Sequence, residues 1–175
     1  MSSRIALFAT GGTFDKRYDE LTGRLAFGDT HLPEMLRLGR CRVDVVLRQL
    51  MMMDSLDMTD VERRDIGNAC LAAAESRIVI THGTDTMVET ARALAAVVPA
   101  ERGKTIVLTG AMVPYAFGSS DGLFNLGSAL SFVQVLPAGV YVAMNGRAFR
   151  WDDVAKNRAT GTFENLEAGT RNVEP

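Results

Sequence analysis

The sequence predicts a doubly wound α/β domain, in which helices cover both faces of a mainly parallel sheet. Short runs of apolar and β-branched residues alternate along the chain with longer segments whose apolar residues recur at helical spacing. The strand-like runs are apolar at consecutive positions, as expected for parallel strands that are buried on both faces. Since 175 residues suffice for one domain with a real core, we expect a single α/β domain over residues 1–175.

Five runs rich in apolar and β-branched residues are expected to form strands. These are Arg4–Ala9, Arg42–Met51, Arg77–Thr81, Thr105–Thr109 and Gly139–Met144. Helices are expected from Thr59, over Thr86–Val98 and over Asp121–Val135. Thr59 starts its helix because Thr59-Asp60-Val61-Glu62 has the form of a capping box. Residues 160–175 are polar and show no periodicity, so we expect loop or partly ordered structure there.

Composition excludes several classes of function. With 47% hydrophobic and 23% charged residues, the chain is typical of a soluble globular protein. A formal net charge of -2 gives no reason to expect nucleic acid or an anionic membrane as a partner. Cys41 and Cys70 lack metal-ligand or disulfide-framework spacing and are interpreted as buried thiols. The N-terminal apolar run is too short for a signal peptide, and no stretch reaches membrane-spanning length, so a cytoplasmic location is expected.

Polar clusters follow all five expected strands. Two of them, Thr10-Gly11-Gly12-Thr13 and His82-Gly83-Thr84-Asp85-Thr86, come directly after a strand and combine glycine with threonine. The others are Asp54-Ser55-Leu56-Asp57, Gly110-Ala111-Met112, and Asn145-Gly146 with the later Asp152–Lys156. If the strands are parallel, these clusters share the carboxyl edge of the sheet, where open α/β sheets bind ligands. Glycine permits sharp turns and a close approach of the backbone to a ligand at that edge.

The residue types in these clusters suit acyl transfer on a small amide. A threonine hydroxyl is a poor nucleophile until a neighbour accepts its proton, and Tyr18, Asp85 and Lys156 are candidates for that neighbour. Backbone N–H groups in the glycine-rich loops are candidates to stabilise a developing oxyanion. Asp85 is also a candidate partner for a substrate ammonium. His31 and His82 are isolated from any metal-ligand spacing, so neither a metal nor a cofactor is expected.

Each motif also has a structural explanation. Thr10–Thr13 alone is compatible with a simple strand-to-helix turn, and Thr86 with an N-cap of the following helix. His82 is expected to form a hydrogen bond within its own loop more than to act as a base. Lys156 and Tyr18, taken singly, are compatible with solvated surface residues.

Several segments, in order, resemble the bacterial-type L-asparaginase family. The matching segments are Ala9-Thr10-Gly11-Gly12-Thr13, Ile80–Thr90, Thr109-Gly110-Ala111-Met112, Ser120-Asp121-Gly122 with Asn125, and Asp153-Val154 with Lys156. The resemblance runs from Ile5 to about Phe163. In the family this region is the N-terminal domain of an α/β fold, and a smaller C-terminal domain follows it.

The resemblance implies a role for individual residues. Thr13 corresponds to the nucleophile that forms an acyl-enzyme, and Tyr18, on the mobile loop after it, to the tyrosine that polarises its hydroxyl. Thr84, Asp85 and Lys156 correspond to a second catalytic group, in which the lysine and the aspartate tune the second threonine. Further positions correspond to substrate contacts: Asp85 to the ammonium, Ser55 to the α-carboxylate and the backbone of Ala111 to the amide being cleaved, with Gly12, Leu56 and Gly83 beside them.

Three departures from the family pattern stand out. Leu56 takes the place of a polar residue beside the substrate, and Val113 that of an arginine common after Gly-Ala-Met. In two-domain members, the C-terminal domain of a neighbouring subunit supplies an acidic residue to the first catalytic group. This chain is not expected to have that domain. We therefore expect either that a residue of the polar tail, Glu164 or Glu167, or a residue of another protomer replaces the acidic residue, or that the activity is weakened.

The resemblance implies an amidohydrolase that converts L-asparagine to L-aspartate and ammonia through a threonyl acyl-enzyme. It also implies a homo-oligomer, either a dimer or a tetramer. Two alternatives remain open. One is a related amidase or glutaminase with relaxed specificity, which Leu56 would permit. The other is a domain that binds an amino acid without turnover.

Overall fold

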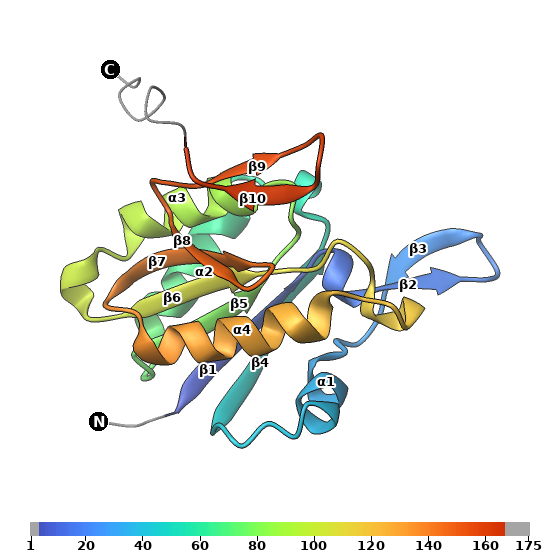
Figure 1. Ribbon diagram of the computed structural model, residues 1–175, viewed down its shortest axis with the longest axis horizontal. Helices are drawn as coiled ribbons and strands as arrows, with labels where there is room; N and C mark the ends of the chain where they lie inside the picture. Colours follow the sequence, from blue (N-terminus) through green and yellow to red (C-terminus); the bar gives the residue numbers. More distant parts are fainter. Residues whose placement is uncertain (1–3, 167–175) are drawn as a thin grey trace.

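The computed structural model describes residues 4–166, which form a six-stranded sheet flanked by helices (Figure 1). The strand order is β4-β1-β5-β6-β7-β8. The strands are β1 (Ile5–Gly11), β4 (Val45–Met53), β5 (Arg77–Thr81), β6 (Thr105–Thr109), β7 (Gly139–Met144) and β8 (Arg147–Arg150). Neighbouring strands from β4 through β7 are parallel, and only β8 runs antiparallel. The predicted mainly parallel sheet is therefore confirmed.

Within residues 4–166, four α-helices cover the two faces of this sheet. They are α1 (Leu32–Leu38), α2 (Asp60–Ala72), α3 (Met87–Val97) and α4 (Gly122–Val135). Alternate residues of β1 separate the core into two halves, as the pleat of a strand requires. Ala6 and Phe8 pack with α2 and α3, whereas Ile5 and Leu7 pack with α1 and α4. Figure 1 shows α4 crossing in front of the sheet, so helices lie on both faces as predicted.

The predicted elements are confirmed with small shifts at their ends. The first strand continues to Gly11, and the second begins at Val45 instead of Arg42. The capping box is present: the Thr59 hydroxyl accepts a hydrogen bond from the Val61 N–H, and the Glu62 carboxylate accepts one from the Thr59 N–H at 2.7 Å. The helix accordingly begins at Asp60, directly after its cap.

Several short elements were not expected from the sequence. They are the antiparallel hairpin of β2 (Lys16–Asp19) and β3 (Arg24–Phe27), helix α1, strand β8, and the small sheet of β9 (Ala155–Asn157) and β10 (Thr162–Glu164). The hairpin projects from the body of the domain (Figure 1). Its strands are largely exposed, so they lack the apolar alternation that marks a half-buried strand.

Two expectations need correction. The segment expected to be loop from residue 160 contains β10, because Phe163 is buried in the core and its strand pairs with β9; residues 167–175 lie outside the described part. Cys70 is buried, and burial raises the pKa of its thiol to about 12. Cys41 is only half-buried, so the interpretation of two buried thiols holds for one of them.

Candidate active site

Close contacts between glycines bring three of the predicted loops together. A Cβ atom on Gly12 would lie 2.3 Å from the backbone nitrogen of Gly83, and one on Gly83 would lie 2.4 Å from Ser55 Oγ. Both distances are far below van der Waals contact, so only glycine fits at these two positions. The loops after β1, β5 and β4 are thereby stacked at the carboxyl edge of the sheet. This arrangement confirms that the polar clusters after the strands converge.

The loop after β6 joins the same edge. A Cβ atom on Gly110 would lie 2.5 Å from the carbonyl oxygen of His82, so this backbone also packs directly against the loop after β5. Asn125 on α4 donates a hydrogen bond to the Gly110 carbonyl at 2.9 Å, and the Asp121 carboxylate accepts one from the Met112 N–H at 3.0 Å. These contacts fix Ala111, which is fully buried, between two anchored residues.

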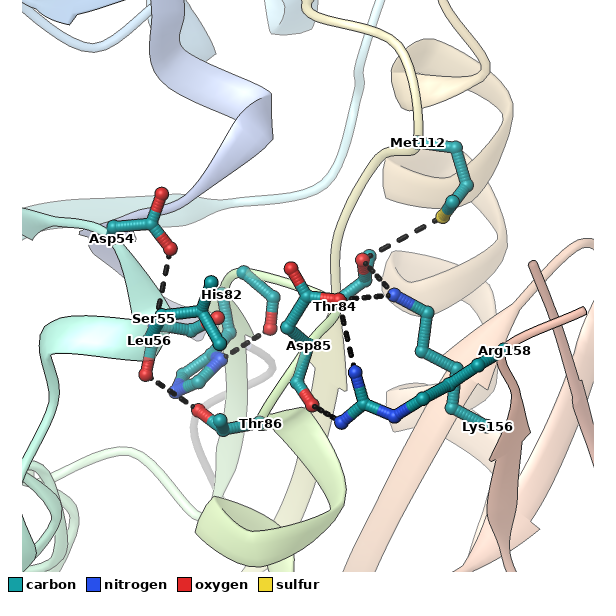
Figure 2. A network of polar contacts seen from close by, with 11 residues as sticks. Asp54, Ser55, Leu56, His82, Thr84, Asp85, Thr86, Met112, Lys156 and Arg158 are labelled. Carbon is teal, nitrogen blue, oxygen red and sulfur yellow. Dashed lines mark hydrogen bonds and ion pairs between the residues drawn. The ribbon is translucent and has the colours of Figure 1, made fainter.

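Lys156 connects two of the predicted site residues. Its Nζ, on β9, donates to Thr84 Oγ1 at 2.9 Å and lies 2.7 Å from Asp85 Oδ1 (Figure 2). Thr84 is 4% exposed, and its hydroxyl donates a hydrogen bond to the sulfur of Met112 at 3.6 Å. The Lys156 ammonium can only donate a hydrogen bond, so it polarises the Thr84 hydroxyl. The Met112 thioether is a weak acceptor, so it binds the hydroxyl hydrogen only weakly. The contact brings together Thr84, Asp85 and Lys156, as the sequence analysis expected.

Arg158 is a member of this cluster that the sequence analysis missed. Its Nη1 lies 3.9 Å from Asp85 Oδ1, and its Nη2 donates to the Asp85 carbonyl oxygen at 3.4 Å. Side chains two residues apart on a strand point to the same face. Had β9 been recognised as a strand, continuing this period one residue past its end at Asn157 would have placed Arg158 beside Lys156.

Thr13 and Tyr18 lie on different elements of this structure. Thr13 begins the 3₁₀ helix η1 (Thr13–Asp15), directly after Gly12. None of the hydrogen bonds within residues 4–166 involves its hydroxyl. Tyr18 lies on β2 of the projecting hairpin and is 60% exposed. The pairing of Tyr18 with Thr13 therefore stays a prediction.

Ser55 and Leu56 lie side by side on the 3₁₀ helix η2 (Ser55–Asp57) but differ in exposure. Ser55 is 1% exposed, and among the described residues its Oγ has no hydrogen-bond partner. Leu56 is 64% exposed. The buried hydroxyl is a donor and an acceptor without a partner, which suits a ligand group, whereas the leucine presents only apolar surface.

An ion pair that the sequence analysis did not predict links the Thr13 segment to the Ser55 segment. Lys16, at the start of β2, pairs with Asp54, which also accepts a hydrogen bond from the Leu56 N–H at 3.1 Å. Burial tends to raise the pKa of Asp54, but the Lys16 ammonium and the backbone N–H groups outweigh it and hold that pKa below its usual value. The pair thus anchors the base of the hairpin to the start of η2.

Asp15 holds the same base of the hairpin from the other side. Its Oδ1 accepts hydrogen bonds from the Thr30 hydroxyl and from the His31 N–H, both at 2.9 Å. The side chain is fully buried, and burial raises the pKa of its carboxyl group. The residues before β2 and after β3 are therefore tied together, although the hairpin itself is exposed.

His82 is a structural residue of the loop after β5. Its Nδ1 lies 2.8 Å from the Gly83 carbonyl oxygen, and its Nε2 lies 2.9 Å from the Thr90 hydroxyl, which accepts from Arg63. Complete burial lowers the pKa of His82 to about 4, so the ring is neutral near pH 7. A neutral ring must donate through Nδ1 and accept through Nε2, which satisfies every partner. The expectation that His82 bonds within its loop is confirmed.

Of the two tail residues expected to supply an acidic group, only Glu164 lies in the described part. It belongs to β10 and pairs in register with Ala155, on the exposed side of that strand. Glu167 lies outside the described residues. Within residues 4–166, no group of three or more His, Cys, Asp or Glu side chains is arranged to hold a metal ion.

The stacked glycine loops and the Lys156–Thr84–Asp85 contact can be compared with known proteins. Residues 4–171 match the family described as "Asparaginase, N-terminal". This chain belongs to the asparaginase family. The resemblance stated from the motifs is thereby confirmed.

Relatives of this asparaginase-family chain cover nearly all of it. It is 34% identical to the "Probable L-asparaginase periplasmic" of Haemophilus influenzae over 95% of the chain and 50% of that protein. It is 35% identical to a subunit of the glutamyl-tRNA(Gln) amidotransferase of Methanococcus vannielii over 81% of the chain and 34% of that protein. The solved thermostable L-asparaginase of Thermococcus kodakarensis superposes with a TM-score of 0.80 at 29% identity, covering 93% of the chain and 51% of that structure.

The asparaginase-family chain thus spans about half the length of the L-asparaginases that it matches. The Haemophilus relative is described as periplasmic, so the relatives leave the compartment open. None of the helices within residues 4–166 is long and apolar enough to cross a membrane.

Proposed function

We propose that this chain carries the active site of an amidohydrolase that converts L-asparagine to L-aspartate and ammonia through a threonyl acyl-enzyme. The observation that carries the proposal is the contact of Lys156 with both Thr84 and Asp85 at the edge where the Thr13 loop also lies. Packing alone does not explain why the largely buried Lys156 side chain donates a hydrogen bond to the Thr84 hydroxyl. Membership in the asparaginase family supports the same reaction class.

In the first step, Thr13 Oγ1 attacks the carbon of the side-chain amide and its proton passes to a neighbouring base. The carbonyl oxygen becomes an oxyanion, and backbone N–H groups of the stacked loops, including that of Ala111, are the donors proposed to stabilise it. Because no described side chain hydrogen-bonds to the Thr13 hydroxyl in this structure, the hydroxyl is free to take this role. Tyr18, on the hairpin that follows Thr13, is the group proposed to accept the proton.

Collapse of the tetrahedral intermediate breaks the bond between carbon and nitrogen. The nitrogen must gain a proton to leave as ammonia, and the Thr84 hydroxyl, polarised by Lys156, is the group proposed to relay it. Water then attacks the Thr13 ester, and the Thr13 oxygen leaves with a proton as L-aspartate is released. Asp85 holds the Lys156 ammonium in place throughout.

A wider specificity is the second candidate function. Leu56 is exposed beside Ser55, where the family pattern has a polar residue, so the contacts to the amino acid are fewer. The chain also matches a subunit of the glutamyl-tRNA(Gln) amidotransferase, so an amide other than L-asparagine is a candidate substrate. A glutaminase or a relaxed amidase is therefore the alternative, and an amino-acid-binding domain without turnover is the other outcome. We further propose that the chain acts as a homo-oligomer, a dimer or tetramer, in the cytoplasm.

Ammonia release from L-asparagine and L-glutamine by the purified protein tests the proposal. Thr13→Ala is expected to abolish release, and Thr13→Ser is expected to retain part of it, because serine keeps the hydroxyl. Added hydroxylamine should divert the acyl-enzyme to the β-hydroxamate of aspartate at the expense of free aspartate. Release of ammonia without hydroxamate, or unchanged release by Thr13→Ala, would contradict the acyl-enzyme.

A further inference from the structure

Arg158 places a second positive charge on Asp85. Lys156 Nζ and Arg158 Nη1 both approach Asp85 Oδ1, at 2.7 Å and 3.9 Å (Figure 2). In addition, Arg158 Nη2 donates to the Asp85 carbonyl oxygen. One carboxylate thus faces two cationic side chains, which leaves an excess of one positive charge around it. Asp85 is consequently a weaker partner for a substrate ammonium than a carboxylate with one cationic neighbour would be.

The two cations differ in their access to solvent. The Lys156 side chain is 10% exposed, and the Arg158 side chain is 67% exposed. Both line a cavity of about 180 Å³, together with Asp85, Glu89 and Arg92. Three of the five charged residues around this cavity are cationic. An anionic group that enters it meets the exposed guanidinium, whereas a cationic group is repelled by it.

Ser55 and Leu56 lie across the site from Arg158 (Figure 2). Leu56 presents an exposed apolar side chain, and the buried Ser55 hydroxyl beside it has no partner among the described residues. A hydroxyl donates well to a carboxylate. Ser55 therefore suits the acidic end of a substrate, and nothing observed on Leu56 suits an amino group.

From these contacts we infer that the site prefers short amides of dicarboxylic acids that carry no α-amino group, and that Arg158 determines this preference. The inference rests on the proposed function, because it names the substrate class of the same site. Arg158 acts through charge: it weakens the attraction between Asp85 and an ammonium, whereas the single carboxylate of the substrate is left to Ser55. The reaction at the amide carbon is unchanged.

Succinamic acid is the matched probe, because it is L-asparagine without the α-amino group. The ratio of kcat/KM for succinamic acid to that for L-asparagine is expected to exceed one in the full chain. Arg158→Gln is expected to lower this ratio about two- to fivefold, the size typical of an exposed charge contact. Leu56→Gln should lower it further by offering a polar group to the ammonium. Arg92→Gln is the control: it removes the same charge from the rim of the same cavity, away from the Asp85 ion pairs, and it should leave the ratio unchanged.

Binding of the two products, succinate and L-aspartate, separates this inference from the proposed function. Titration calorimetry should show tighter binding of succinate, with the difference reduced in Arg158→Gln. If neither amide is hydrolysed but succinate still binds more tightly, the catalytic proposal is wrong, and the part of the inference that stands is the binding preference for the compound without an α-amino group. If L-asparagine is the better substrate and Arg158→Gln leaves the ratio unchanged, the inference is wrong and the catalytic proposal stands. Equal effects of Arg158→Gln and Arg92→Gln, or no binding of either product, would also overturn the inference.

Discussion

The backbone of Gly12 lies directly against that of Gly83, so that a Cβ atom on Gly12 would stand 2.3 Å from the Gly83 nitrogen. The residue after Gly12 is Thr13, and the residue after Gly83 is Thr84. The contact between two glycines therefore sets how closely the two threonines of the proposed reaction lie. It also explains why both motifs contain glycine immediately before the threonine.

Gly12→Ala is expected to destabilise the fold and disorganise the site. Gly12 has a φ of 76°, which costs a residue with a Cβ atom about 1–2 kcal/mol, and the clash with Gly83 adds to that cost. We expect a fall of about 3 kcal/mol in the free energy of unfolding in urea, together with loss of amide hydrolysis.

Gly103→Ala is the matched control for this substitution. Gly103 has a similar φ of 68°, but a Cβ atom there would meet nothing within 4 Å. Gly103→Ala should lower the free energy of unfolding only by the cost of the positive φ, and activity should be unchanged. Equal destabilisation by the two alanines would show that the glycine contact is not what constrains the site.

Lys156→Met is expected to lower kcat strongly and to change the free energy of unfolding only slightly. The substitution keeps the length of the side chain but removes the ammonium that contacts Thr84 and Asp85. Loss of a positioned proton-transfer group typically costs about 10²–10⁴-fold in rate. Steady-state kinetics with the preferred amide measure the change, and urea unfolding measures stability.

Lys104→Met provides the contrast. Lys104 donates to the carbonyl oxygens of Ala73 and Glu75, away from the site, so its loss should lower stability and leave kcat unchanged. If Lys156→Met behaves in the same way as Lys104→Met, the lysine of β9 is structural and the proposed relay through Thr84 is wrong.

The ion pair of Lys16 with Asp54 is expected to stabilise the protein more than an exposed pair does. Both side chains are about three-quarters buried or more, with 20% and 27% exposure. A double-mutant cycle with Lys16→Met and Asp54→Asn should give a coupling of about 1 kcal/mol. The exposed pair of Arg4 and Asp44, in a cycle with Arg4→Met and Asp44→Asn, is the comparison and should give less.

The ion pair of Lys16 with Asp54 is also expected to make the stability of the fold depend on pH in the acidic range. Because the pKa of Asp54 is lower in the folded protein than in the unfolded chain, its stabilisation is present above the unfolded value and is lost as the pH falls through the folded value. Stability measured from pH 5 downward should therefore fall less steeply in Lys16→Met than in the natural sequence. A slope that is unaffected by Lys16→Met would mean that the pair does not set this pKa.

His82 is expected to control stability between pH 4 and pH 6.5. Its pKa in the fold is about 4, below the ordinary value of 6.5, so within this window the unfolded chain binds a proton that the folded protein does not. Stability should be complete above pH 6.5 and should fall toward pH 4 by about 2–3 kcal/mol. Urea unfolding across this range measures it. His82→Gln should flatten the dependence, whereas His31→Gln, at the only other histidine, should leave it in place.

Much of the fold follows from patterns within a few residues. The capping box at Thr59 and Glu62 involves neighbours along one helix turn, and it was confirmed as predicted. The hairpin of β2 and β3 was missed because its residues are exposed, and it is held at its base by Asp15 and Lys16 through contacts with Thr30, His31 and Asp54. The turn at Asn145 and Gly146 carried a usable signal, since both residues have positive φ and this dipeptide favours a two-residue hairpin.

The sequence by itself determined the five parallel strands of the sheet and that the polar residues after them gather at one edge, because hydrophobic periodicity and parallel pairing are enough to place them there. It also placed Thr13, Thr84, Asp85 and Lys156 in one family pattern. Only the tertiary structure decided which of these side chains touch: Lys156 reaches Thr84 across 72 positions of sequence, and Arg158 joins it on Asp85. Such contacts depend on strand order, register and side-chain direction, which local sequence patterns do not specify.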